Sequence, residues 1–205
     1  MFENIKADWS RRTTFYTTTG ERKSWQHSSH PIWNKIRISL EMGMLAAVLY
    51  RYGKWAQKIR SPLIRKPLLF IYFILNCCMM VFFGINLQLD GEIGKGLIVH
   101  NYSGIFIMAE KIGENFTCNQ GVTIGRLRGR PRDAIIGNNV YFGAGAKCLG
   151  DVTIGDNVVV GANSLVLTSI PDNCTVIGVP ARIVSRSVSS PYSKLIVAQQ
   201  PENNE

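Results

Sequence analysis

The chain has 205 residues, of which 46% are hydrophobic and 18% are charged, and its formal net charge is +9. This composition is too apolar for a disordered chain, and the length fits one domain or one domain with an appendage. Lys and Arg outnumber Asp and Glu by 13 to 4 in residues 1–66, whereas the two kinds number 10 each in residues 67–205. Since a nucleic-acid enzyme carries its basic surface around its working site, this segregated charge predicts no nucleic-acid partner.

Residues 1–86 are predicted to form a basic N-terminal helical region. Apolar residues recur at spacings of three and four between Ile32 and Lys58, which is the pattern of one helix face. The first residues, MFENIK, contain no early apolar segment, and the five cysteines of the chain show no C-x-x-C spacing. We therefore expect no secretory signal and a cytoplasmic location.

Residues 68–83 form an almost unbroken apolar run of sixteen residues, for which a helix is predicted. The run lies at the lower edge of the length that spans a bilayer. Three alternatives remain open: a helix that caps the following domain or packs in an oligomer, a segment on a membrane surface, and a true span. We favour peripheral docking at the inner face of the cytoplasmic membrane, with the cap second, because basic residues that suit anionic lipids precede the run. These residues are Lys54, Lys58, Arg60, Arg65 and Lys66.

From residue 87 onward, an aliphatic or small apolar residue recurs every six positions, with few slips, and Gly follows it at seven of these places. A period of six fits neither a strand nor a helix, and it indicates a repeat solenoid. Each hexapeptide forms one short strand whose apolar residue points inward, so three hexapeptides make one coil of a triangular prism. Residues 87–184 are predicted to form this mainly β, parallel β-helix, and residues 185–205 a C-terminal tail. Three cysteines fall on interior positions, so we expect them to be packing residues rather than nucleophiles. The repeat residues are Leu87, Ile93, Val99, Ile105, Ile112, Cys118, Ile124, Ile136, Phe142, Cys148, Ile154, Val160, Val166, Ile170 and Val176.

Three segments of the repeat, residues 136–147, 154–164 and 176–184, resemble the left-handed β-helix hexapeptide acyltransferases. The motifs Gln120-Gly-Val-Thr-Ile-Gly125 and Gly178-Val-Pro-Ala-Arg182 make the resemblance specific. Within that superfamily the chain resembles the serine-acetyltransferase-like branch, and most closely its colanic-acid and capsule polysaccharide O-acetyltransferases. The resemblance implies a left-handed β-helix, a homotrimer, and acetyl-CoA as a co-substrate held between neighbouring prisms.

The resemblance also implies catalytic roles for His100 and Asn101. An imidazole has a suitable pKa for taking the proton from a hydroxyl that attacks a thioester carbonyl, and His100 is the one histidine of the predicted prism. In the serine acetyltransferases the catalytic histidine lies three residues before a glycine, a place that Asn101 holds here, whereas His100 matches the first member of a His-His pair in the polysaccharide relatives. Because a shift of one residue along a strand reverses the side-chain direction, an exposed corner histidine is the alternative.

Two further positions depart from the serine acetyltransferases: Asn86 stands where their orienting aspartate lies, and Asp133 stands near their second active-site histidine. Free serine needs fixed charged partners for its ammonium and carboxylate groups. We therefore expect the acceptor to be a sugar hydroxyl of exopolysaccharide or capsule biosynthesis, on a carbohydrate or lipid-linked oligosaccharide. The alternatives are a serine O-acetyltransferase of cysteine biosynthesis and a non-catalytic β-helix that serves as a scaffold or binding module.

CoA contacts are implied at small residues, at a cation near the C-terminus and in an arginine-rich loop. Residues 126–133 interrupt the repeat with four arginines, whose guanidinium groups suit CoA phosphates or an anionic polysaccharide. The alternatives are a solvated loop for the arginines and plain coil packing for the small residues. No metal is predicted, because the zinc site of γ-class carbonic anhydrases, which share the β-helix, needs three histidines. The predicted cofactor-binding residues are Gly143, Ala144, Gly161, Ala162, Arg182 and Arg128.

Overall fold

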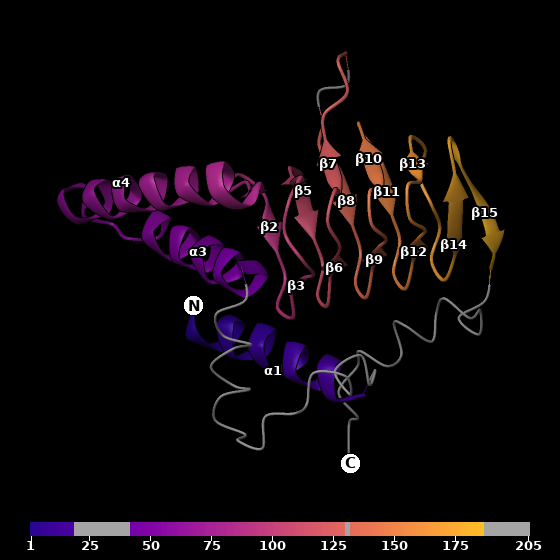
Figure 1. The fold of residues 1–205 in the computed structure, drawn as a ribbon. Helices are drawn as coiled ribbons and strands as arrows, with labels where there is room; N and C mark the ends of the chain where they lie inside the picture. The colour runs from indigo at the N-terminus through magenta and orange to yellow at the C-terminus, as the bar shows by residue number, and fades with distance from the viewer. Residues whose placement is uncertain (19–41, 130–131, 187–205) are drawn as a thin grey trace.

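The protein is a prism of short strands with helices gathered at its N-terminal end, as a computed structural model describes it for residues 1–18, 42–129 and 132–186 (Figure 1). The parallel β-helix predicted from the sixfold period is confirmed, as is the helical region before it. Part of the helix predicted between residues 32 and 58 lies outside the described residues. The described helices are α1 (Phe2–Thr18), α3 (Met42–Gln57) and α4 (Pro62–Cys78), which continues into a π-helical turn, η1 (Met79–Phe83).

Three sheets form the sides of the prism, and the strands of each sheet come from successive coils. The strands pair in parallel, and Tyr141 opposes Val159, which lies three hexapeptides later. At the C-terminal end β14 and β15 pair antiparallel and close the last coil. The first sheet contains β1 (Ile85–Leu87), β4 (Ile105–Ile107), β7 (Thr123–Gly125), β10 (Lys147–Leu149) and β13 (Leu165–Val166); the second contains β2 (Glu92–Ile93), β5 (Ala109–Ile112), β8 (Ala134–Ile136) and β11 (Thr153–Ile154); the third contains β3 (Ile98–Val99), β6 (Thr117–Cys118), β9 (Tyr141–Phe142), β12 (Val159–Val160), β14 (Thr175–Gly178) and β15 (Ala181–Ser185).

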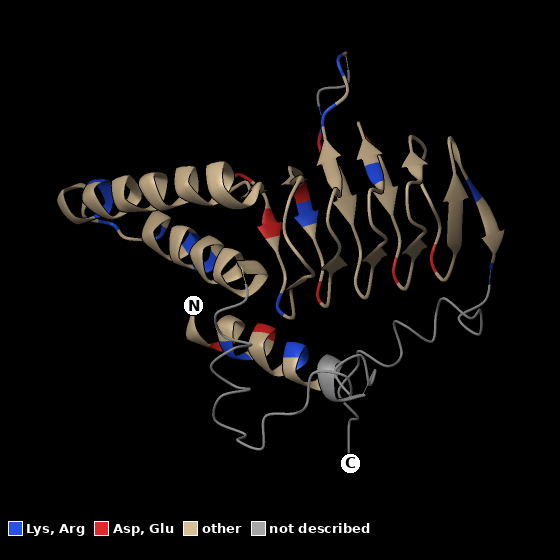
Figure 2. Ribbon diagram, viewed as in Figure 1, with Lys and Arg blue, Asp and Glu red and all other residues tan. Residues whose placement is uncertain are grey.

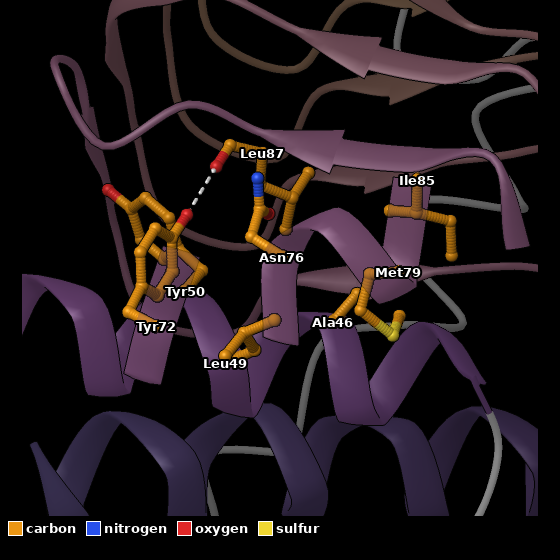
Figure 3. A pocket seen from close by; sticks show the side chains of 8 residues that line it. All are labelled: Ala46, Leu49, Tyr50, Tyr72, Asn76, Met79, Ile85 and Leu87. Atoms are coloured by element: carbon orange, nitrogen blue, oxygen red, sulfur yellow. Dashed lines mark hydrogen bonds between the residues drawn. The ribbon is translucent and has the colours of Figure 1, made fainter. Parts of the chain in front are cut away.

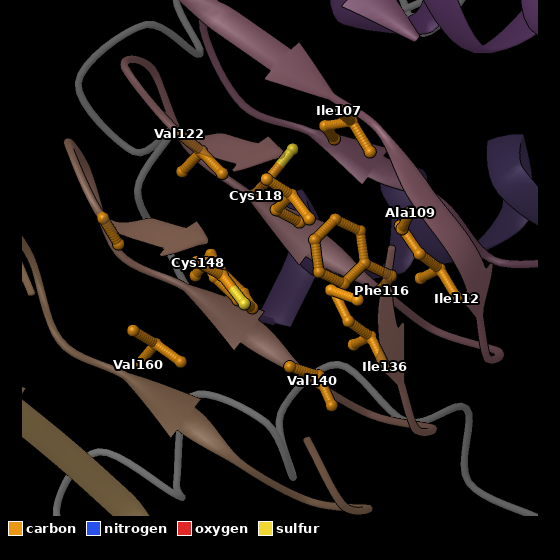
Figure 4. Close-up of a cluster of buried hydrophobic side chains, with 14 of the residues drawn as sticks. Ile107, Ala109, Ile112, Phe116, Cys118, Val122, Ile136, Val140, Cys148 and Val160 are labelled. Atoms are coloured by element: carbon orange, nitrogen blue, oxygen red, sulfur yellow. The ribbon is translucent and has the colours of Figure 1, made fainter. Parts of the chain in front are cut away.

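The repeat residues fill the axis of the prism (Figure 4). The rings of Phe116 and Phe142 lie there with their centroids 5.6 Å apart. Cys118, Cys148 and Cys174 are buried as predicted, and burial raises the pKa of the first two thiols to about 12. Since a thiol is nucleophilic only as the thiolate, these cysteines are packing residues.

Asparagines turn one edge of the prism. Asn115, Asn139, Asn157 and Asn173 all adopt a positive φ between 55° and 59°, a backbone conformation that asparagine tolerates better than most residues. The side-chain amide of each of the first three donates a hydrogen bond of 3.0 Å to the amide oxygen of the next asparagine in the series. The ladder therefore ties four coils together at their corners.

Helices α1 and α3 dock on the first coil through a buried ion pair. Arg51 of α3 donates to both carboxylate oxygens of Asp8 of α1, at 3.0 and 3.2 Å, and both side chains are almost fully buried. The same Asp8 carboxylate accepts the backbone N–H groups of Gly96 and Leu97 at 2.7 and 2.8 Å. Arg51 also donates to the carbonyl of Ile93 at 2.5 Å. Asp8 thus links α1 to α3 and to the turn between β2 and β3.

Two further arginines of α1 extend this contact to the third sheet. Arg11 donates to the carbonyl of Gly96 and, at 3.1 Å, to the hydroxyl of Thr117. Arg12 is buried and donates to the carbonyl of Val99 at 3.1 Å. Part of the N-terminal basic charge therefore serves docking inside the molecule rather than contact with a partner.

Helix α4 lies against α3 and the first strand. It begins at Pro62, six residues before the predicted apolar helix, because Pro62 fits the first turn of a helix. The Tyr72 hydroxyl donates to the Leu87 carbonyl at 3.5 Å beside a small pocket between α3, α4 and β1 (Figure 3). No residue of α4 itself is buried, so the single chain does not use α4 as a buried cap. The pocket is lined by Ala46, Leu49, Tyr50, Tyr72, Asn76, Met79, Ile85 and Leu87.

Candidate functional site

One edge of the prism, where the third sheet turns toward the first, brings together most of the predicted catalytic and cofactor residues. Four residues that each follow a strand of the third sheet stack there, coil upon coil. The backbone N–H of each donates to a carbonyl of the next coil at 2.8–3.2 Å, so neighbouring residues lie about 4.8 Å apart. We call this line the His100 edge, and its members are His100, Asn119, Gly143 and Gly161.

His100 is buried under helix α1, with 8% of its surface exposed. Burial, together with the positive charges of Arg12 and Arg11, lowers its pKa to about 3. The imidazole is therefore neutral at pH 7, which is the form that can accept a proton. The same low pKa makes it a weak base.

Asn101, the next residue, is exposed. Its backbone φ of 58° turns the corner, and its Nδ2 donates to Gln120 Oε1 at 2.9 Å. The neighbouring Tyr102 is also exposed and meets the ring of Phe83 edge-on, with the centroids 6.2 Å apart. The exposed groups of this corner can hold a hydroxyl or a carbonyl in place, but an amide does not take a proton at neutral pH.

The small residues predicted to contact CoA lie further along the same edge. A Cβ on Gly143 would come within 2.5 Å of the backbone nitrogen of Ala162, so Gly143 is required for coil stacking. Gly161 approaches Ile177, and the exposed Arg182 of β15 pairs in register with Ile177. Ala144 is half-buried. From β3 to β15 the third sheet makes five strand steps, or about 24 Å.

Arg128 lies on a different edge. The loop that carries it joins β7 of the first sheet to β8 of the second and projects from the prism (Figure 2). The base of the loop is held by Arg126, whose Nε and Nη2 donate to Asp133 at 2.6 and 2.8 Å. These hydrogen bonds and the carboxylate charge raise the pKa of Arg126. A single chain does not bring Arg128 to the His100 edge.

Sequence reasoning missed Asn119. Its Nδ2 donates to the Tyr141 hydroxyl at 2.8 Å and to the Phe142 carbonyl at 3.0 Å, between His100 and Gly143 on the edge. A signal was present, because His100 and Asn119 occupy the place after a repeat residue where glycine stands at seven other repeats. Among the described residues, no three His, Cys, Asp or Glu side chains gather as metal ligands would.

Residues 133–168 match the family described as bacterial transferase hexapeptide (six repeats). A serine acetyltransferase of Synechococcus elongatus is 34% identical over 148 residues, which cover 71% of this chain and 58% of that relative. A serine acetyltransferase of Staphylococcus xylosus is 38% identical over 139 residues, covering 66% of this chain and 64% of the relative. The chain therefore spans less than two thirds of the length of these relatives.

Solved structures of serine acetyltransferases share the fold. That from Brucella abortus superposes with a TM-score of 0.69 at 24% identity, covering 91% of this chain and 69% of the other. The Brucella abortus enzyme in complex with coenzyme A gives a TM-score of 0.67 at 25% identity, covering 88% and 69%. The Neisseria gonorrhoeae enzyme in complex with serine gives 0.66 at 25% identity, covering 89% and 68%. The left-handed β-helix implied by the resemblance is confirmed.

The comparisons correct the predicted acceptor. The similar proteins are named serine acetyltransferases, so the assignment to the polysaccharide branch, and with it the sugar or lipid-linked oligosaccharide acceptor, is wrong. The error came from reading departures at Asn86, Asn101 and Asp133 as evidence for another acceptor. Asp133 has a structural partner in Arg126. The absence of a residue that the serine acetyltransferases use weakens serine as the acceptor, but it is not evidence for a sugar.

Proposed function

We propose that this chain, which belongs to the hexapeptide-repeat acyltransferase family, transfers an acetyl group from acetyl-CoA to the hydroxyl of serine. The stacking of His100, Gly143 and Gly161 along one edge is the observation that carries the proposal. It sets the histidine and the small residues in one line along one edge of the prism. The names of the similar proteins support serine as the acceptor, and the similar structure with coenzyme A supports the donor.

The proposed reaction is a direct acyl transfer. The serine hydroxyl oxygen attacks the thioester carbonyl carbon while a base accepts the hydroxyl proton. The carbonyl oxygen becomes an oxyanion, which backbone N–H groups stabilise. The C–S bond then breaks, the acetyl group stays on the serine oxygen, and the proton held by the base passes to the leaving CoA thiolate. The products are O-acetylserine and CoA.

His100 is the proposed base, and Asn101 the proposed group that positions the acceptor. His100 is the one imidazole beside the edge within the described residues, and it is neutral at pH 7. A base with a pKa of about 3 keeps the rate flat down to about pH 4, whereas a base restored to the ordinary histidine pKa of 6.5 loses activity below that value. The pH–rate profile therefore reports the state in which His100 works.

The donor is proposed to lie past Ala144 and Ala162, with Arg182 near its phosphates. Arg128 reaches that place only from a neighbouring prism, which fits a homotrimer with CoA between subunits. A cytoplasmic location is part of the proposal, and it is supported by the five cysteines, all of which are free.

A second candidate is a β-helix that binds acetyl-CoA without turning it over. Two points favour it: the resemblance to the serine acetyltransferases places Asn101 where their catalytic histidine lies, and burial makes His100 a weak base. This candidate keeps the donor contacts and omits the proton transfer.

The test is thiol release from acetyl-CoA by the full chain with L-serine, with O-acetylserine identified by mass spectrometry. We expect release by the natural chain and a loss of about 100-fold in kcat for His100→Asn, with the KM for acetyl-CoA unchanged. Circular dichroism checks that the variant is folded. Binding of CoA without release, measured by calorimetry, selects the second candidate. Absence of both binding and release contradicts the proposal.

A further inference from the structure

The continuous helix Pro62–Phe83 presents an apolar surface that nothing in the described chain covers. Its 22 residues contain an 18-residue window with a mean hydropathy of 1.9, of which 6% is buried. At 1.5 Å per residue the helix is about 33 Å long. It is the one described helix that is long and apolar enough to cross a membrane.

One side of this helix is fixed to the rest of the molecule. Tyr52 of α3 donates its hydroxyl to the Leu68 carbonyl at 3.1 Å, and Tyr72 donates to the Leu87 carbonyl at 3.5 Å. The opposite side faces away from the prism, and we call it the α4 face. Its large apolar side chains are between 46% and 85% exposed. They are Leu63, Ile64, Phe70, Ile71, Phe73, Ile74, Leu75, Met80, Val81 and Phe82.

The segment of the chain that carries the α4 face is basic. Residues 42–83 contain six Lys and Arg and not one Asp or Glu. Arg51 is used internally, since it is buried against Asp8. The other five cluster where α3 ends and α4 begins (Figure 2). They are Lys54, Lys58, Arg60, Arg65 and Lys66.

We propose that the α4 face is a membrane-docking surface, which lies in the headgroup region of an anionic bilayer with the basic cluster on the lipid phosphates. A helix that joins an exposed apolar face to basic residues binds such surfaces through apolar burial and charge together. The same charge opposes a second copy of the chain as the occupant, because two α4 faces would bring two uncompensated basic clusters together. Attachment of α4 to α3, which carries Lys54 within its last turn, opposes a full span.

The proposal is tested by flotation of the full chain with lipid vesicles. We expect the protein to float with vesicles of phosphatidylcholine and phosphatidylglycerol in equal parts, and not with phosphatidylcholine alone. Raising the salt from about 0.1 M to about 1 M shortens the screening length from about 10 Å to about 3 Å, so binding should weaken.

Two variants separate the apolar and the charged contributions. The double variant Phe70→Asp/Phe73→Asp should bind anionic vesicles at least about tenfold more weakly, since two exposed aromatic side chains no longer insert. The double variant Arg65→Glu/Lys66→Glu should lose at least about fivefold in binding for each basic side chain that it replaces. Val184→Asp, an equally exposed valine on β15, is the matched control and should float as the natural chain does.

Three results would overturn the proposal. The natural chain could remain with the soluble fraction at low salt when anionic vesicles are present. Phe70→Asp/Phe73→Asp could lower the mass of the assembly in light scattering without changing flotation, which would make the α4 face a contact between subunits. Finally, the natural chain could resist alkaline carbonate extraction from membranes, which would make α4 a span. None of these readouts depends on acetyl transfer.

Discussion

The prism and the helical region are held together differently. In the prism, apolar side chains from every coil fill the axis, and asparagine side chains form hydrogen bonds from one coil to the next. Helices α1 and α3 are instead attached to the prism through a few buried charged groups that are not repeated along the chain. Residues 67–205, which contain the prism, carry no net charge, and the excess positive charge of the chain lies before them. In a repeat protein, the free energy of folding is distributed over many similar contacts between neighbouring repeats. The helical region instead depends on a few groups, so single substitutions should affect the two regions differently.

The largest expected effect comes from the prism core. Phe142→Ala removes a fully buried ring and should lower the free energy of unfolding by about 4 kcal/mol. Because each coil supports its neighbours, the loss should appear in urea unfolding of the whole prism. Val184→Ala, at an exposed position of β15, is the control and should change stability little. Unfolding confined to one or two coils would show that the prism is less cooperative than its packing indicates.

The docking of the helices depends on Asp8. Asp8→Ala leaves Arg51 and two backbone N–H groups of the β2–β3 turn without their buried partner, at a cost of about 3 kcal/mol. Hydrogen exchange should quicken in α1 and around Gly96 while β6 to β14 stay protected. Glu3→Ala, at an exposed position of the same helix, should leave exchange unchanged. Equal loss of protection throughout the prism would erase the distinction between the two regions.

The burial of His100 between α1 and the prism also predicts that the free energy of unfolding depends on pH. The folded pKa of His100 is lowered from 6.5 to about 3, so the unfolded state binds the proton first as the pH falls. The stability that the neutral His100 contributes is fully present above pH 6.5 and is lost as the pH falls toward 3. In this range the free energy of unfolding should fall by up to about 1.4 kcal/mol per pH unit. Urea unfolding from pH 4 to pH 8 should show this extra slope in the natural chain and not in His100→Gln. Parallel curves for the two proteins would contradict the burial of His100.

The smallest effect tests the asparagine ladder. Asn139→Gly keeps the positive φ available and loses two side-chain hydrogen bonds, whereas Asn139→Ala loses the same bonds and adds backbone strain. Alanine should therefore be less stable than glycine by about 1 kcal/mol in thermal unfolding. If the two variants have equal stability, the corner does not select asparagine for its backbone conformation.

The same difference explains how far the sequence predicts the structure. The sixfold period located the strands and the inward residues such as Phe142 and Cys148, because every coil repeats one pattern. The docking of Asp8 and Arg51 joins residues 43 positions apart by a contact that occurs once, and no periodic signal marks it. No feature of the sequence distinguished the buried Arg11, Arg12 and Arg51 from the exposed basic residues.

The candidate site divides in the same way. Gly143 and Gly161 follow repeat residues, so their alignment with His100 could be predicted from the period. The burial of His100 could not, because it is produced by Arg12 and the rest of α1, which lies nearly ninety residues earlier in the chain. The alternative of an exposed corner histidine is wrong for His100, which is buried, whereas Asn101 beside it is exposed.

The most direct test of the account is the rate of thiol release from acetyl-CoA with L-serine for the natural chain and Ala162→Trp. Ala162 is exposed and follows Gly161 of the His100 edge, so a bulky ring there should block the donor without disturbing the core. We expect the KM for acetyl-CoA to rise about tenfold, which corresponds to a loss of about 1.4 kcal/mol of binding, while the KM for serine stays constant. An unchanged KM for acetyl-CoA in a folded Ala162→Trp variant would contradict a donor site on this edge.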